Sequence, residues 1–215
     1  MYTAILFDLD GTLTDPREGI LKSVQNALTE EGFVAPPIQE LEWIIGPSLR
    51  ESFATIANLN VTDERIERLM LRYRERFGPI GVYENHVFPE VPALLTTLRE
   101  QNIRCFVATS KPTVYAEKIV THFHLNHYFT KVLGSELDGT RENKAEIIQT
   151  LVEEFHLEPE KTLMVGDRKY DMIGAKKNNM HAAGVLYGFG SRAELLEAQA
   201  DHLANSPIEI LNFIR

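Results

Sequence analysis

Short apolar runs alternate with helical patterns along most of this chain. The apolar runs lie near residues 3–8, 103–109, 130–134, 162–166 and 182–187. Such runs are typical of strands that are buried on both faces. Helical spacing of apolar residues occurs between them, near residues 90–101, 113–123, 142–156, 170–178 and 191–198. Alternating strands and helices predict parallel strands with crossover helices, so we expect an α/β fold with a doubly wound, Rossmann-like parallel sheet.

Residues 16–80 have a different pattern, which predicts helices only. Pro16 stands at a favoured first-turn position, apolar residues follow at helical spacing, and Gly32 ends this first helix. Further helices are expected near residues 38–45, 48–58 and 62–77. We therefore predict an α/β core of residues 1–15 and 81–215, with a small all-helical domain of residues 16–80 inserted after the first strand.

Acidic residues follow two of the predicted strands. Asp8 and Asp10 end the first strand, and they point to the same side because side chains alternate along a strand. Asp167 and Asp171 follow a later strand and are one helical turn apart. An Asp-Gly turn or a capping carboxylate explains single members of these pairs, but not two acidic strand ends. A hard cation would relieve the repulsion between such carboxylates, and Mg²⁺ prefers oxygen ligands.

Two further residues stand at predicted element boundaries. Ser110 follows the strand near 103–109, where a hydroxyl group and backbone N–H groups can bind an anion. The alternative is a serine that caps the next helix. Lys144 opens an amphipathic helix, a place where a single lysine is most often a solvated surface group.

Together these elements occur in the order of the motifs of the haloacid dehalogenase superfamily, which the chain resembles over essentially its whole length. Asp8–Thr12 matches the first motif, Ser110 the second, Lys144 the third, and Asp167 with Asp171 the fourth. Within the superfamily the chain resembles the phosphoglycolate phosphatase-like branch, which carries a helical cap after the first motif. Most members are phosphatases, so the resemblance implies a hydrolase of phosphate esters.

The resemblance also implies the role of each motif residue. Asp8 attacks phosphorus and becomes an aspartyl-phosphate, while Asp10 protonates the leaving alkoxide and then deprotonates water. Ser110 and Lys144 are the other catalytic residues and stabilise the phosphoryl group. The implied metal-binding residues are Asp8, Asp10 (through its backbone carbonyl), Asp167 and Asp171. Mg²⁺ is the expected cofactor, and Mn²⁺ stays open because it takes the same oxygen ligands.

Substrate choice is expected to lie in the helical cap. The loop from Gly46 to Arg50 resembles the cap loop that reaches the active site in relatives, although Arg50 is as typical of a surface cation. The candidate substrate-binding residues are Thr12, Gly46, Arg50, Thr109, Lys111 and Arg141.

The composition and charge of the chain narrow the classes of molecule that we expect it to bind. The formal net charge of the 215 residues is −9 and no basic run occurs, which argues against a nucleic-acid polymer as partner. Cys105 is the only cysteine, so no intrachain disulfide can form. The sequence shows no apolar stretch of membrane-spanning length and no signal-peptide pattern. We therefore expect a cytoplasmic protein, monomeric or homodimeric, that acts on a small phosphorylated metabolite without binding a membrane.

Three functions are weighed. The leading one is a Mg²⁺-dependent phosphatase for a small phosphomonoester such as phosphoglycolate or a nucleoside monophosphate. The alternative is a sugar phosphomutase similar to β-phosphoglucomutase, which would use the same acidic pair but needs a second phosphate-binding group in the cap; Ile45 stands where mutase-like loops carry a basic residue. A noncatalytic binding protein is the third, and the intact acidic motifs argue against it.

Overall fold

The computed structural model describes residues 1–214 and divides the chain into two compact units. Met1–Asp15 and the chain from Val87 onward form the first unit, and Pro16–His86 form the second. The substrate-selecting role expected for residues 16–80 stays a prediction. No helix within residues 1–214 is long and apolar enough to cross a membrane.

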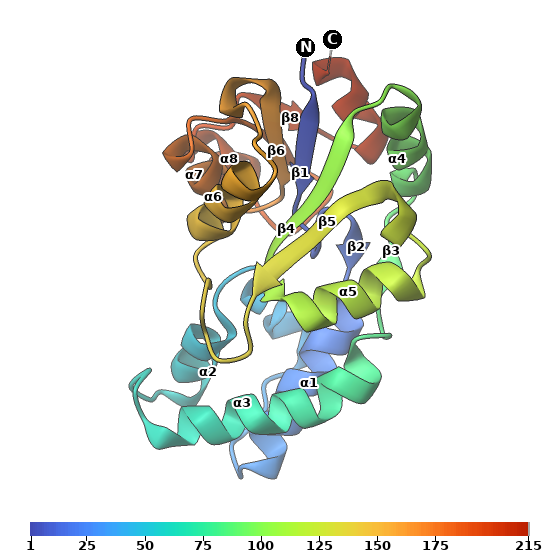
Figure 1. Ribbon diagram of the computed structural model, residues 1–215. Helices are drawn as coiled ribbons and strands as arrows, with labels where there is room; N and C mark the ends of the chain where they lie inside the picture. The colour runs from blue at the N-terminus through green and yellow to red at the C-terminus, as the bar shows by residue number, and fades with distance from the viewer. Residues whose placement is uncertain (215) are drawn as a thin grey trace. The chain divides into compact units, whose positions relative to one another are not determined.

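A parallel sheet forms the centre of the first unit (Figure 1). Within residues 1–214 it has six strands, in the order β5-β4-β1-β6-β7-β8. Their bounds are Ala4–Phe7 (β1), Arg104–Pro112 (β4), Phe129–Ser135 (β5), Thr162–Gly166 (β6), His181–Val185 (β7) and His202–Ala204 (β8). All neighbouring strands pair in parallel. The chain runs outward from β1 through β4 and β5, and then in the other direction from β6. The predicted doubly wound sheet is therefore confirmed, and its strand order reverses at β1.

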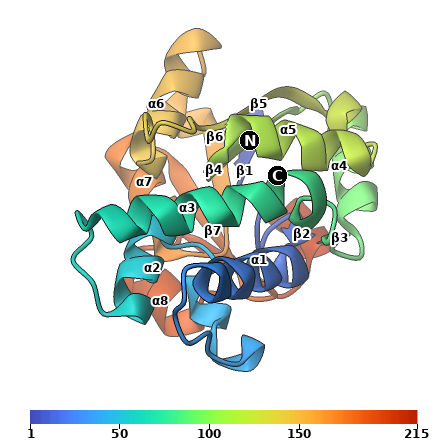
Figure 2. The same cartoon turned by 90° about the horizontal axis from the view of Figure 1, so that it is seen from below.

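Helices cover both faces of this sheet (Figure 2). On one face lie α4 (Val91–Glu100) and α5 (Thr113–His122); on the other lie α6 (Lys144–Glu154), α7 (Lys169–Lys177) and α8 (Arg192–Glu197). Leu6, Phe106 and Met164 are aligned on neighbouring strands. They are fully buried in one cluster with Ile147 of α6 and Met172 of α7. Because the residues between them face the other helical layer, the central strands read as continuous apolar runs.

The second unit is built from helices. α1 (Arg17–Glu30), α2 (Leu49–Ala57) and α3 (Glu64–Arg76) are followed by the π-helical turn η3 (Phe77–Gly81). The ring of Tyr73 stacks on that of Phe77 at 5.1 Å, and Phe53 meets Tyr73 edge-on at 6.4 Å. A Cβ atom on Gly19 would lie 1.9 Å from the carbonyl oxygen of Gly81, so α1 can approach η3 this closely only at a glycine.

The helix predicted near residues 38–45 is not one continuous α-helix. Two 3₁₀ turns, η1 (Ile38–Glu40) and η2 (Glu42–Ile44), occupy this segment. The segment lies between Pro37 and Pro47, and each proline disfavours the α-helical conformation at the residue before it.

Several short elements were not predicted. The sequence pattern missed β8, which has only three residues. It also missed β2 and β3, which pair in a separate two-stranded sheet. These elements and the remaining 3₁₀ turns are β2 (Thr14–Asp15), β3 (His86–Val87), η4 (Asn126–Tyr128), η5 (Pro159–Lys161) and η6 (Pro207–Phe213).

Candidate active site

The acidic and polar motif residues meet at one edge of the sheet. Asp8 directly follows β1, Asp167 directly follows β6, and Ser110 lies in the last part of β4. Phe7, the last residue of β1, is aligned with Val107 of β4 and Val165 of β6. Parallel strands bring their carboxyl ends to the same edge, and a crevice forms where the strand order reverses. Residues about a hundred and sixty positions apart in the sequence therefore share one small space because of the sheet topology.

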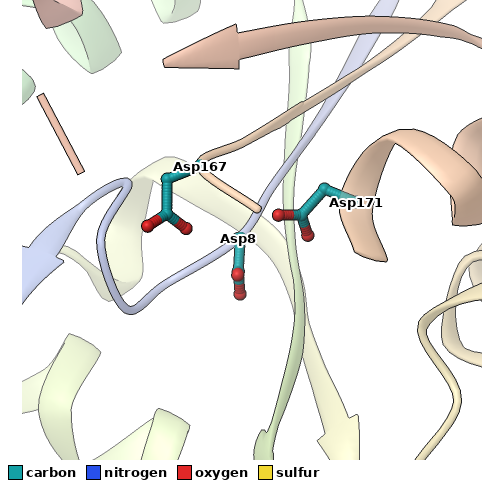
Figure 3. Close-up of side chains that lie close together, drawn as sticks. All are labelled: Asp8, Asp167 and Asp171. Carbon is teal, nitrogen blue, oxygen red and sulfur yellow. The ribbon is translucent and has the colours of Figure 1, made fainter. Parts of the chain in front are cut away.

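Asp8, Asp167 and Asp171 form a carboxylate cluster (Figure 3). One carboxylate oxygen from each lies within 4.8 Å of the others. All three residues are buried, with exposed fractions of 8%, 1% and 0%. Asp171 comes from the first turn of α7, where its Oδ2 atom accepts a hydrogen bond of 3.1 Å from the backbone N–H of Arg168. The sequence pattern predicted this acidic group, and the fold brings it together.

Burial and mutual repulsion make the negative charge of this cluster unfavourable unless a cation balances it. Burial raises the pKa of Asp167 well above its ordinary value, and the carboxylates of Asp171 and Asp8 raise it further. The pKa of Asp171 is also raised, chiefly by burial, although Lys144 opposes the shift. The Oδ1 atom of Asp167 is buried and has no hydrogen-bond partner among the described residues. A carboxylate oxygen in this state is suited to bind a cation.

The formal charges of the site also favour the binding of a cation. The site contains four aspartates and two lysines. Lys144 pairs with Asp8 and Asp171, Lys111 pairs with Asp10, and Asp167 completes the carboxylate cluster. The formal charge of the fully ionised site is thus −2, which one divalent cation would neutralise. An all-oxygen donor set is the kind that Mg²⁺ and Mn²⁺ take, so the residues present fit the expected metal.

Lys144 is a buried cation at the start of α6, not the solvated surface group that such a lysine most often is. Its Nζ atom lies 3.0 Å from Oδ1 of Asp8 and 2.8 Å from Oδ1 of Asp171. Nζ also donates a hydrogen bond of 3.0 Å to the carbonyl of Ala108. Burial alone would lower the pKa of Lys144, but the carboxylates of Asp171 and Asp8 outweigh it and raise the pKa. The ammonium group therefore stays charged and holds the nucleophile candidate in place.

Lys111 forms a second buried ion pair, with Asp10. Its Nζ atom lies 2.8 Å from Oδ2 of Asp10, and the two side chains are 6% and 15% exposed. The other oxygen of Asp10, Oδ1, is buried without a hydrogen-bond partner among the described residues. Burial raises the pKa of Asp10, and Lys111 opposes that shift. A carboxyl group with one oxygen held by a lysine and the other without a hydrogen-bond partner is suited to exchange a proton with a bound ester.

An irregularity in β4 places Lys111 there. Ala108 is aligned with Leu133 and Pro112 with Ser135, so four steps along β4 match two along β5. Residues 109–111 are therefore displaced from the regular ladder, as in a β-bulge. The carbonyl of Lys111 comes so close to Gly134 of β5 that a Cβ atom there would lie 2.0 Å from it. The sequence around Lys111 carries no sign of this contact, because it depends on a residue of the next strand.

The other predicted substrate residues have different surroundings. The side chains of Thr12 and Thr109 are buried in the core unit, and Thr109 Oγ1 accepts a hydrogen bond from the backbone N–H of Lys111 at 3.3 Å. Ser110 is partly exposed, and its carbonyl accepts a hydrogen bond of 2.8 Å from Oγ of Ser135. Arg141 forms an ion pair with Glu136. Gly46 and Arg50 belong to the second unit, where Arg50 forms an ion pair with Glu67.

Comparison with known proteins identifies the family. Residues 5–185 match the family model described as haloacid dehalogenase-like hydrolase. The chain belongs to this family. The prediction made from the four motifs is confirmed.

Three similar proteins refine this assignment. A Pseudomonas aeruginosa protein named 5′-nucleotidase is 46% identical over 201 residues, which are 94% of this chain and 90% of the relative. A phosphoglycolate phosphatase of Vibrio vulnificus is 26% identical over 224 residues, covering 98% of this chain and 95% of the relative. The crystal structure of a predicted phosphatase from Clostridium acetobutylicum has a TM-score of 0.94 at 40% identity, covering 100% of this chain and 98% of that one. The protein is thus a phosphoric monoester hydrolase of the haloacid dehalogenase family, with the predicted resemblance to phosphoglycolate phosphatases.

Proposed function

We propose that this phosphatase hydrolyses a small phosphomonoester of the nucleoside monophosphate or phosphoglycolate type, with Mg²⁺ and through an aspartyl-phosphate on Asp8. The observation that carries the proposal is the pairing of each acid with its own lysine. Lys144 contacts Asp8, and Lys111 contacts Asp10. Two carboxylates in one small site are in this way given separate surroundings, which is what a nucleophile and a proton donor need.

Asp8 is the nucleophile in this mechanism. Its Oδ1 atom accepts a hydrogen bond of 2.7 Å from the backbone N–H of Leu9 and lies 3.0 Å from Nζ of Lys144. These contacts fix the rotation of the carboxylate, so that Oδ2 can form the bond to phosphorus while the bond to the ester oxygen breaks. Such fixed geometry lowers the entropic part of the barrier.

Asp10 moves the proton. In the first step its carboxylic acid gives a proton to the leaving alkoxide, which departs as an alcohol. In the second step its carboxylate takes a proton from water as the water oxygen attacks phosphorus. The bond between phosphorus and Asp8 then breaks, inorganic phosphate leaves, and both aspartates return to their starting states.

The metal site and the phosphoryl site complete the proposal. Asp8, Asp167, Asp171 and the backbone carbonyl of Asp10 would hold Mg²⁺, whose charge neutralises the phosphoryl oxygens when it is bound. The hydroxyl group of Ser110, in the last part of β4, would donate a hydrogen bond to a phosphoryl oxygen. Lys144 would offset the negative charge that develops during transfer.

The names of the relatives support the substrate class. The relative at 46% identity is named a 5′-nucleotidase, and the one at 26% a phosphoglycolate phosphatase. The higher identity favours a nucleoside monophosphate. The phosphomutase alternative gains no support, because Ile45, at the position of the basic residue of mutase-like loops, is 1% exposed.

The test is phosphate release with Mg²⁺ from nucleoside monophosphates, phosphoglycolate, hexose phosphates and pyrophosphate. We expect one of the first two classes to be hydrolysed fastest and Asp8→Asn to lose at least about a thousandfold in kcat. Asp63→Asn is the matched control, because Asp63 caps α3 in the second unit and asparagine caps equally well. Formation of hexose 6-phosphate from hexose 1-phosphate without free phosphate would support the mutase instead. The absence of release from every substrate would contradict the proposal.

Three further expectations remain predictions. They are a cytoplasmic location, a monomeric or homodimeric state, and Mg²⁺ as the cofactor, with Mn²⁺ left open. Each can be measured on the purified protein or in cells without knowledge of the substrate.

A further inference from the structure

One segment beyond the family match contacts both acidic loops of the site. The match ends at residue 185, which is also the last residue of β7, and Tyr187–Gly190 follow after one intervening residue. The hydroxyl group of Tyr187 donates a hydrogen bond of 3.0 Å to the carbonyl of Thr12. The backbone N–H of Phe189 donates one of 2.7 Å to Oδ2 of Asp167. We call residues 187–190 the clamp segment, because they connect the turn after Asp10 to a candidate metal ligand.

The turn that Tyr187 contacts is compact and carries Asp10. The N–H groups of Thr12, Leu13 and Thr14 point to the carbonyl of Leu9, at 3.3, 2.9 and 3.0 Å. The N–H of Gly11 closes the turn on the carbonyl of Thr14 at 2.8 Å. With its N–H used inside the turn, Thr12 offers its carbonyl outward, and Tyr187 binds it. The position of this turn therefore depends partly on the clamp segment.

Two glycines let the clamp segment lie directly against the site. A Cβ atom on Gly188 would lie 2.4 Å from Cβ of Asp167 and 2.4 Å from the carbonyl oxygen of Gly11. A Cβ atom on Gly190 would lie 1.8 Å from the carbonyl oxygen of Asp167. Neither glycine is among the residues with positive φ angles. These positions therefore require glycine for space and not for backbone conformation.

Both ends of the clamp segment are themselves held. The ring of Phe88 packs edge-on against Tyr187 at 5.1 Å, which fixes the tyrosine ring. At the other end, Ser191 caps α8 by accepting a hydrogen bond from the N–H of Glu194. Glu194 in turn accepts hydrogen bonds of 2.9 Å from Nε of Arg168 and from the N–H of Lys169, at the start of α7. The clamp segment thus has a defined position relative to both acidic loops.

We propose that the clamp segment fixes the spacing between the turn that carries Asp10 and the metal ligand Asp167, with Tyr187 as a positioning residue. For catalysis this rests on the proposed function; for metal binding it does not. The backbone N–H of Phe189 orients the Asp167 carboxylate, because it donates its hydrogen bond to Oδ2 and leaves Oδ1 for the cation. Groups that orient a metal ligand from outside commonly change metal affinity by about ten- to a hundredfold when they are altered.

The test compares three variants by Mn²⁺ binding, followed by electron paramagnetic resonance of the free ion, and by steady-state kinetics. Tyr187→Phe removes only the hydroxyl group that binds Thr12. Tyr128→Phe is its matched control, since that hydroxyl bonds to Oγ1 of Thr96 at 2.9 Å, before the start of β5 and thus at the opposite edge of the sheet. Gly188→Ala places a methyl group against Asp167 and Gly11.

We expect Tyr187→Phe to lower kcat about fivefold at an unchanged KM and to weaken Mn²⁺ binding about threefold, the effect of one lost hydrogen bond. Gly188→Ala should weaken Mn²⁺ binding about tenfold or more. Tyr128→Phe should leave both quantities unchanged. If Gly188→Ala does not fold, as judged by circular dichroism, Tyr187→Phe decides alone.

The proposal is overturned if Tyr187→Phe matches Tyr128→Phe in Mn²⁺ affinity, kcat and KM. An equal loss of thermal stability in the two variants with a difference in metal affinity would support positioning over a merely structural role. If the wild-type protein binds Mn²⁺, and the variants change this affinity as expected, but no phosphate ester is hydrolysed, then the proposed function fails and the clamp segment stands.

Discussion

At the scale of single residues, the site is organised by two buried lysines. Lys144 contacts Asp8 and Asp171, while Lys111 contacts Asp10. Removing one partner of a buried pair costs more than the pair contributes, because a charge stays behind without compensation. The sequence indicated Lys144 through its motif, but it suggested a substrate contact for Lys111. The structure places the Lys111 ammonium group 2.8 Å from the carboxylate of Asp10, the candidate proton donor, and the substrate contact stays a prediction.

Replacing Lys111 should therefore impair the reaction of Asp10 more than substrate binding. We expect Lys111→Met to lower kcat about tenfold or more, the usual effect of losing a hydrogen bond to a charged group, with a smaller change in KM. Lys161→Met is the control, since Lys161 pairs with Glu158 on the surface. A rise in KM at an unchanged kcat would show instead that Lys111 serves the substrate.

The single cysteine tests how tightly the core is closed. Cys105 is 2% exposed in β4, and burial raises the pKa of its thiol to about 12. Because the thiolate is the reactive form, we expect no reaction with Ellman's reagent in the folded protein at neutral pH and one thiol per chain after denaturation. Rapid labelling of the folded protein would contradict this burial.

At the scale of elements, the bulge in β4 decides where the second motif lies. The expected strand near 103–109 extends to Pro112 as β4, and its register shift displaces residues 109–111. Local patterns predicted the strand because apolar residues fill it. They could not predict the bulge, because the bulge needs the close approach of Gly134 from β5. The 3₁₀ turns in place of a helix near 38–45 are a similar case, since flanking prolines outweighed the apolar pattern.

A side chain at Gly134 should open this bulge. Its Cβ would lie 2.0 Å from the carbonyl of Lys111, so we expect Gly134→Ala to lower the free energy of unfolding by about 1–3 kcal/mol and to lower kcat as Lys111 moves. Chemical denaturation and steady-state kinetics measure the two effects. Thr130→Ala, at an exposed site of the same strand, should change neither by a comparable amount. Equal behaviour of the two variants would mean that the bulge tolerates the methyl group.

At the scale of the whole molecule, the doubly wound sheet concentrates negative charge at one edge. Four aspartates and two lysines meet there, and burial raises the pKa of Asp167. The folded protein without metal therefore carries repulsion that a divalent cation relieves. A cation that binds only the folded state also stabilises it by mass action, by about 2.7 kcal/mol at a hundred times Kd.

Removing the metal should therefore lower the stability of the folded protein, whereas removing one of the buried carboxylate charges should not. We expect Mg²⁺ to raise the Tm of the wild-type protein and chelation with EDTA to reverse the rise. Asp167→Asn should be at least as stable as the wild type without metal, because one buried charge is gone, and should show little rise in Tm with Mg²⁺. Differential scanning fluorimetry measures both. An unchanged metal response in Asp167→Asn would exclude this residue as a ligand.

The sequence by itself determined the type of sheet, the two acidic strand ends, Lys144 and the family. These features depend on apolar periodicity and on motif residues near one another in the chain, so they can be read locally. Only the tertiary structure decided that Lys111 pairs with Asp10 and that Tyr187–Gly190 lies against Thr12 and Asp167. Both contacts join segments that follow or belong to different strands. The contact of Lys111 depends on the bulge in β4, and those of Tyr187–Gly190 depend on glycines that leave room for the backbone. Their geometry is set by register and close packing, which no local pattern of residues contains.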